Sequence, residues 1–140
     1  PIMKIPTPLT LSAAIFISLM ITVPAPSVAR ATDKVKYYTV CGSGSYERMF
    51  KRTVSSVTIS LYAKELRNGD VAVCARGVKT DSSNRATLQV KLSSSDGSYT
   101  SSTTQGASVS VPHTYKSGTS GRLYVKRSSS VLFNGKFNAN

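Results

Sequence analysis

The stretch of residues 57–76, VTISLYAKELRNGDVAVCAR, decides the fold class of this 140-residue chain. Its first half alternates apolar residues with more polar ones, since Val57, Ile59 and Leu61 are separated by Thr58 and Ser60. A hydrophobic period of two is typical of a β-strand with one buried face. Its second half returns with the apolar run VAVCA. The stretch therefore predicts two strands joined by a tight turn.

The turn at Asn68-Gly69 allows the register of this hairpin to be predicted. Asn-Gly is the preferred pair for a two-residue type I′ turn, because both turn residues need a positive φ. Such a turn would place Cys74 opposite Ala63 and would put Val73 on the same face as Tyr62. Both faces of the hairpin would then be apolar, which indicates a central pair of strands. A turn one residue longer would change this register, and that alternative stays open.

The same period of two recurs outward from this hairpin, at residues 88–92, 109–111 and 123–125. Further strands are expected at residues 35–40, 99–103 and 131–133. Turn-forming pairs separate the strands, at Asp96-Gly97, Gln105-Gly106, Ser117-Gly118 and Asn134-Gly135, and at residues 82–84. Short strands at this spacing predict an all-β domain, a small antiparallel β-sandwich or barrel.

Two other regions carry weaker signals. Residues 47–52 and 64–67 have helical composition, but neither segment is long enough to stand alone as a helix. The Ser/Thr-rich residues 93–108 have few large apolar side chains, so we expect a flexible loop or an edge region there.

The N-terminal residues 1–31 have the composition of a secretory signal peptide. Lys4 precedes an apolar run at residues 9–23, and prolines and small residues follow it. This order matches the charged region, the apolar region and the cleavage site of such peptides, with the cut expected after Ala31, or else after Ala29. An uncleaved membrane anchor is the alternative, although the run is shorter than the ~20 residues that span a bilayer. Residues 32–140 are then expected to form a single secreted β domain.

Cys41 and Cys74 are the only cysteines of the chain. Export to an oxidising compartment favours a disulfide between them, with free thiols as the alternative. Closing a loop of this length stabilises a fold by about 3 to 4 kcal/mol in the chain-entropy model. Two cysteines and one histidine are too few for a structural zinc site of thiolates and imidazoles. We therefore expect no metal and no cofactor.

The sequence offers few candidate catalytic residues. His113 follows the expected strand at residues 109–111, and we interpret it as a lone exposed loop histidine. Gly42-Ser43-Gly44 lacks the spacing of a nucleophile elbow. Turn formation and surface pairing explain all six carboxylates, which are Asp33, Glu47, Glu65, Asp70, Asp81 and Asp96. The sequence therefore predicts a protein that is not an enzyme.

The basic excess is the most specific chemical feature. The chain has 18 Lys and Arg against 6 Asp and Glu, a net charge of +12. Cations interleaved with aromatic rings can hold a polyanion while the rings stack on it. The candidate residues of this kind are Lys34, Lys36, Arg48, Lys51, Arg52, Lys116, Arg122, Lys126 and Arg127, with Tyr37, Tyr38, Tyr115 and Tyr124.

Outside a cell the expected partner is an anionic cell-wall polymer such as a teichoic acid, an acidic polysaccharide, an anionic lipid surface or extracellular DNA. Binding should then weaken steeply with salt. The alternative is a secreted protein whose charge only keeps it dispersed.

Residues 38–75 carry a resemblance to a known family. The segment VCGSGSY at residues 40–46, then SLY at 60–62 and NGDVAVC at 68–74, resembles the small secreted spore-associated protein A family of actinomycetes. Ser45 is an insertion relative to the pattern of that family. The resemblance implies a secreted, non-enzymatic protein associated with a cell or spore surface. The alternative from another class is a secreted effector, either a small basic antimicrobial or a protease inhibitor presenting a rigid loop at residues 42–46.

Overall fold

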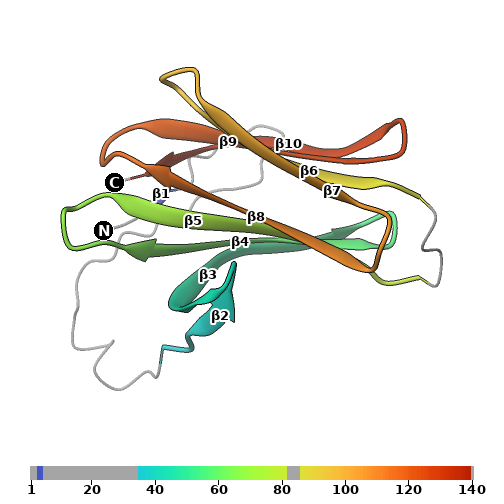
Figure 1. Ribbon diagram of the computed structural model, residues 1–140, viewed down its shortest axis with the longest axis horizontal. Coiled ribbons are helices and arrows are strands. Elements are labelled where there is room, and N and C mark those ends of the chain that lie inside the picture. The colour runs from blue at the N-terminus through green and yellow to red at the C-terminus, as the bar shows by residue number, and fades with distance from the viewer. Residues whose placement is uncertain (1–2, 5–34, 82–85, 140) are drawn as a thin grey trace.

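The chain folds into two five-stranded antiparallel sheets that pack face to face (Figure 1). The computed structural model describes residues 3–4, 35–81 and 86–139. Sheet I contains, in spatial order, β2 (Tyr38–Val40), β3 (Ser43–Val54), β4 (Val57–Glu65), β5 (Val71–Lys79) and β8 (Ser108–Tyr115). Sheet II contains β1 (Met3–Lys4), β10 (Ser130–Ala139), β9 (Ser120–Arg127), β6 (Leu88–Ser94) and β7 (Tyr99–Thr104). The predicted all-β class is confirmed.

Most of the predicted signal peptide lies outside the described residues, as do Asp33, Lys34 and the predicted turn at 82–84. Met3 and Lys4 pair with Ala139 and Asn138 at one edge of sheet II. In the part of the chain that the structure describes, no helix is long and apolar enough to cross a membrane.

The core lies between the sheets and follows the predicted alternation. Ile59 and Leu61 of sheet I share one cluster with Leu88, Val90 and Leu92 of sheet II, and each of the five is at most 2% exposed. Burying an aliphatic side chain of this size contributes about 1.5 to 3 kcal/mol. The alternation therefore points every second side chain of these strands away from the core, and these outward side chains define the two outer faces.

The register of the β4–β5 hairpin differs from the prediction by one residue. Cys74 pairs with Tyr62, not with Ala63. Leu66 donates its N–H to Asp70 O at 2.8 Å, and Gly69 has a φ of 91°. The loop is therefore three residues long with its glycine in the left-handed region, one of the common hairpin geometries, and the predicted two-residue type I′ turn is wrong.

The predicted disulfide Cys41–Cys74 is confirmed, with the two Cα atoms 6.0 Å apart. It fastens the β2–β3 hairpin over the outer face of β4 and β5. There Tyr46 and Tyr62 are buried beside Cys74, and Tyr38 packs against them. This second cluster explains why the run in β5 is apolar on both faces.

Strand β3 is the longest strand described, although residues 47–52 had helical composition. Its register shifts between Arg48 and Phe50, a β-bulge that breaks the alternation on which the prediction depended. The type I′ turn expected at Asn68-Gly69 occurs instead between β3 and β4. There Ser55 and Ser56 have φ values of 47° and 64° between the paired residues Val54 and Val57.

The structure also bears on three further predictions from the sequence. The pair Asn134-Gly135 lies inside β10 and is not a turn. Only Tyr38–Val40 of the expected strand at 35–40 is extended in a sheet. Within residues 93–108, Tyr99–Thr104 forms β7, an edge strand of sheet II, so the edge-region alternative applies there.

Candidate polyanion-binding surface

The structure divides the predicted basic and aromatic residues between two opposite layers. Arg122, Tyr124 and Lys126 alternate with the buried residues of β9 and therefore point outward from sheet II. Tyr38 and Arg48 lie on the outer side of sheet I, over Tyr62. The predicted set is therefore two separate clusters and not one surface.

The larger of the two clusters lies on the outward side of sheet II. Strand order places β6 beside β9, so Lys91 pairs with Tyr124 in register, and Lys136 of β10 pairs with Arg122. We define the sheet II outer face by its charged and aromatic members, which are Lys91, Tyr99, Arg122, Tyr124, Lys126 and Lys136. Lys91, Tyr99 and Lys136 were absent from the prediction.

Lys91 lies at the centre of this face, between two tyrosine rings. Its Nζ is 4.9 Å from the centroid of Tyr124 and 5.5 Å from that of Tyr99, and Tyr99 is 60% exposed. Both distances are within the range of cation–π attraction. Beside them, Arg122 donates to Asn134 Oδ1 at 2.8 Å. These contacts hold the cations and the rings side by side, and they leave the Tyr99 ring accessible to a ligand.

One end of the sheet II outer face is hollowed. A depression of about 280 Å³ is lined by Arg122, Lys136 and several small residues, which are Ser93, Ser94, Ser95, Ser120 and Gly121. Its lining contains two cations and no carboxylate. Hydroxyl and cationic donors around a small open volume suit a phosphate, sulfate or carboxylate group.

The floor of this depression is rigid because Gly121 leaves no spare room. A Cβ atom added there would lie 2.5 Å from the ring of Tyr115 and 2.8 Å from that of Phe137. The Tyr115 hydroxyl donates to Ser93 O at 2.8 Å. Ser93 and Gly121 in the lining of the depression are therefore supported from below by close-packed aromatic rings.

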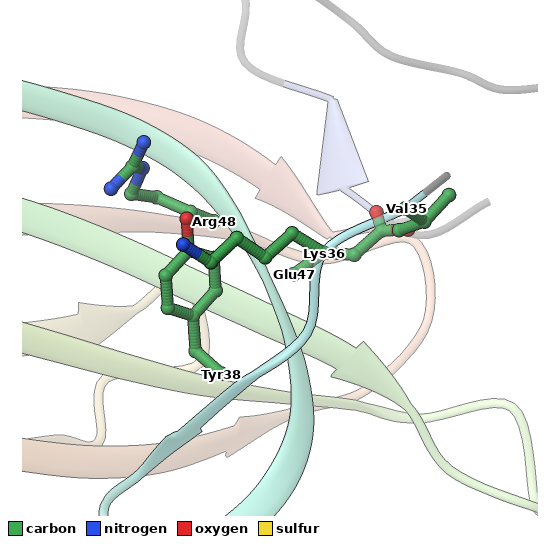
Figure 2. A pocket seen from close by; sticks show the side chains of 5 residues that line it. All are labelled: Val35, Lys36, Tyr38, Glu47 and Arg48. Carbon is green, nitrogen blue, oxygen red and sulfur yellow. The ribbon is translucent and has the colours of Figure 1, made fainter. Parts of the chain in front are cut away.

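The second cluster lies on the outer side of sheet I (Figure 2). The Tyr38 ring has Lys36 Nζ at 5.3 Å and the Arg48 guanidinium at 5.2 Å from its centroid. These three side chains line a second hollow of about 280 Å³ together with Val35 and Glu47. The glutamate makes this hollow less positive than the one on sheet II.

The β-bulge in β3 adds a further cation to this side. Arg48 pairs with Tyr62, and after the bulge Lys51 pairs with Ser60, so both point outward although they are three residues apart. On the other side of Ser60 lies Arg76 of β5, which sequence reasoning missed. We call Lys36, Tyr38, Arg48, Lys51 and Arg76 the sheet I outer cluster.

The remaining predicted cations and rings belong to neither cluster. Tyr115 is 1% exposed in the core, so its assignment to the binding surface is wrong. Arg127 lies apart from Arg122 and Lys126, because it pairs with Asp81 at 3.0 Å and donates to Ser55 O. The exposed residues Tyr37, Arg52 and Lys116 stand outside both clusters as defined.

One cation is removed from the surface altogether. Lys79 is 5% exposed, and its ammonium donates to the carbonyl oxygens of Ala86 and Gln105, the latter at 3.2 Å. A buried charge needs such partners, since desolvation without them is costly. Net charge alone therefore overstates the charge that a ligand meets.

His113 lies half-buried within β8, so the expectation of an exposed loop histidine is wrong. Its Nδ1 is 2.8 Å from Thr100 Oγ1, and its Nε2 is 3.5 Å from Ser98 Oγ. The Ser98 hydroxyl donates to Asp96 Oδ1 at 2.7 Å. In a Ser-His-Asp triad the imidazole lies between hydroxyl and carboxylate, whereas here the hydroxyl lies between them. This arrangement links β7 to β8 and does not activate the serine.

Two titratable groups near the depression are shifted. Hydrogen bonds from the side chain and backbone of Ser98 and from Ser94 lower the pKa of the exposed Asp96 to about 2. Burial raises the pKa of the Tyr115 phenol, and the nearby charge of Asp96 raises it further. Asp96 is therefore ionised, and its carboxylate accepts hydrogen bonds from the backbone and the hydroxyl of Ser98.

No protein-family model matches the chain, and no curated protein matches it. Within residues 3–4, 35–81 and 86–139, no group of three or more His, Cys, Asp or Glu side chains is placed to hold a metal ion. The chemical features that could bind a partner are therefore those of the two outer faces.

Proposed function

We propose that this protein is a secreted, non-enzymatic surface protein that binds anionic polymers through the sheet II outer face. The observation that carries the proposal is the position of Lys91 between Tyr99 and Tyr124, with Arg122, Lys126 and Lys136 around it. Four cations and two rings on one face of a sheet match a chain of repeating negative charges. The partner is an anionic cell-wall polymer or an acidic polysaccharide.

The chemistry follows from this arrangement. The four cations attract the polymer and displace its counterions, which makes affinity fall steeply with salt. The exposed Tyr99 ring offers a flat surface on which a sugar or polyol unit can stack. The depression at Arg122 and Lys136 receives one anionic group and sets the position of the polymer along the face.

The location of the protein is part of the proposal. The signal-peptide composition of residues 1–31 and the resemblance of residues 38–75 to spore-associated protein A support secretion and association with a cell or spore surface. An anionic polymer of that surface would then retain the protein after export.

The protease-inhibitor alternative is less well supported. It requires an exposed, extended loop at residues 42–46, whereas Tyr46 is 4% exposed and Lys64 Nζ donates to Ser43 Oγ at 2.5 Å and to Gly44 O at 3.2 Å. A segment held down in this way does not project into the cleft of a protease. Among the residues that the structure describes, no contact favours the antimicrobial alternative over polymer binding.

The proposal is tested by retention on heparin and on purified anionic cell wall across a salt series. The variant R122Q/K126Q removes two positive charges from the sheet II outer face. We expect it to elute at lower salt and to reduce the slope of log affinity against log salt by about two units, roughly one for each lost contact.

The matched control is R52Q/R67Q, which removes the same charge from exposed positions outside both clusters. It should elute close to the unmodified protein. Equal losses in the two variants would mean that retention reports net charge alone, and the proposal would then be wrong.

A further inference from the structure

We infer that the protein has two polyanion sites on opposite sides and bridges two polymer chains. This inference rests on the proposed function, because it takes the sheet II outer face as the first site. It adds the sheet I outer cluster as a second, independent site. The function would then be to cross-link an anionic surface polymer, beyond coating it.

The sheet I outer cluster has the same components as the first site. Lys36 and Arg48 flank the ring of Tyr38 at 5.3 and 5.2 Å and line a hollow beside it (Figure 2). Lys51 and Arg76 extend the positive charge on either side of Ser60. Two cations held by a ring beside an open hollow suit a polymer that carries repeated negative charges.

The second site is held at a fixed position. Tyr38 packs on Tyr62 with ring centroids 5.3 Å apart, and the disulfide Cys41–Cys74 fastens the hairpin that carries Tyr38. Lys64 donates to Ser43 and Gly44 of the same hairpin. Tyr38, Arg48, Lys51 and Arg76 of this site therefore lie on paired strands, whereas Lys36 precedes β2.

The two sites face away from each other. Each outer face is the reverse side of a sheet whose inner side chains share one core. Packed sheets lie about 10 Å apart, and the outward side chains add to that separation. A short oligoanion seated on one face cannot reach the other, because both layers of the fold lie between the two faces (Figure 1). Two separate chains can therefore be bound at once.

Glu47 gives the second site a distinct character. Glu47 is one of the residues that line the hollow with Lys36 and Arg48, whereas the lining of the sheet II depression contains cations and hydroxyls and no carboxylate. We therefore expect the sheet I site to bind the same polymer more weakly. Weak binding is sufficient for bridging, because the first site already holds the protein at the polymer.

The test measures stoichiometry with a heparin hexasaccharide and bridging with long heparin. Isothermal titration should give two hexasaccharides per unmodified protein, and one for either R122Q/K126Q or R48Q/K51Q. Beads coated with long heparin should aggregate with the unmodified protein and not with either variant, although R48Q/K51Q still binds single beads. The control R52Q/R67Q should keep both stoichiometry and aggregation.

The outcomes separate this inference from the proposed function. One hexasaccharide per unmodified protein, with retention on heparin intact, would overturn bridging and leave the proposed function standing. Absence of any hexasaccharide binding at low salt would overturn both. Aggregation that survives in either variant would mean that one face suffices, through dimers of the protein, and would also overturn the inference. Unfolding curves of each variant establish that the fold is retained.

Discussion

The outer faces of the two sheets differ in what covers them. On sheet I, the face formed by β4 and β5 is apolar around Tyr62 and Cys74, and a disulfide-linked hairpin covers it. On sheet II, Lys91 alternates with the buried Val90 and Leu92, and the described residues leave the outward side open. A strand that is apolar on both faces predicts a covering segment, and a strand that alternates predicts a face available to a ligand.

The largest expected change in stability comes from removing the disulfide that fastens the hairpin over the outer face of sheet I. In the variant C41A/C74A, the loss of a link across 33 residues should lower the free energy of unfolding by about 3 to 4 kcal/mol. Urea unfolding measures the change. Retention on heparin through sheet II should persist at temperatures where the variant is folded, since the disulfide lies on the outer side of sheet I. Loss of that retention from a folded variant would contradict the separation of the two faces.

A pair of tyrosine substitutions sharpens the comparison. Tyr62 is 6% exposed beneath the hairpin, so Y62A should destabilise the fold by about 3 kcal/mol. Tyr124 lies on the open face, so Y124A should change stability by less than about 1 kcal/mol while weakening retention on heparin. Urea unfolding and heparin elution of both variants check the prediction. If Y124A proved the more destabilising of the two, the assignment of covered and open faces would be wrong.

A smaller increase in stability is expected from changing the turn between β3 and β4. Ser55 and Ser56 both have positive φ, and Thr80 and Arg127 donate to their carbonyl oxygens. Asn-Gly adopts this type I′ turn with less strain, so S55N/S56G should raise the free energy of unfolding by about 0.5 to 1 kcal/mol. Thermal unfolding measures the gain, and a clear loss of stability would show that the serine side chains themselves are needed.

The smallest effect concerns pH. The folded pKa of Asp96 is about 2, below the usual value of about 3.9, because Ser98 and Ser94 donate hydrogen bonds to its carboxylate. Its contribution to stability is therefore present above pH 4 and is lost as the pH falls from about 4 to about 2. The difference in unfolding free energy between the unmodified protein and D96A should narrow over that range. A difference independent of pH would show that the carboxylate charge has no part in this turn.

The sequence supported the fold more fully than the site. The alternation around Ile59 and Leu61 predicted the strands and the core, and the two cysteines predicted the disulfide. The register predicted for the β4–β5 hairpin was wrong because an Asn-Gly pair suits both a two-residue and a three-residue loop. Strand β3 was missed because its bulge interrupts the period of two.

The binding residues were harder to predict because strand order is not sequence order. Lys91 joins the site only because β6 lies beside β9, and Lys136 joins because β10 pairs with β9 beyond Asn134-Gly135, which had been expected to form a turn. Tyr115 was included because it lies near cations in the sequence, yet its place in β8 points it into the core. Parity along a strand, counted from a residue known to be buried, would have separated Tyr115 from Tyr124.

The most direct test of polymer binding by sheet II is a titration of the protein with heparin hexasaccharide, followed by amide chemical shifts at low and high salt. We expect the amides of Lys91, Arg122 and Tyr124 to shift and saturate at low salt, and to return to their free positions at high salt. Binding of the hexasaccharide while these amides stay unmoved would contradict the proposal that the sheet II outer face is the site.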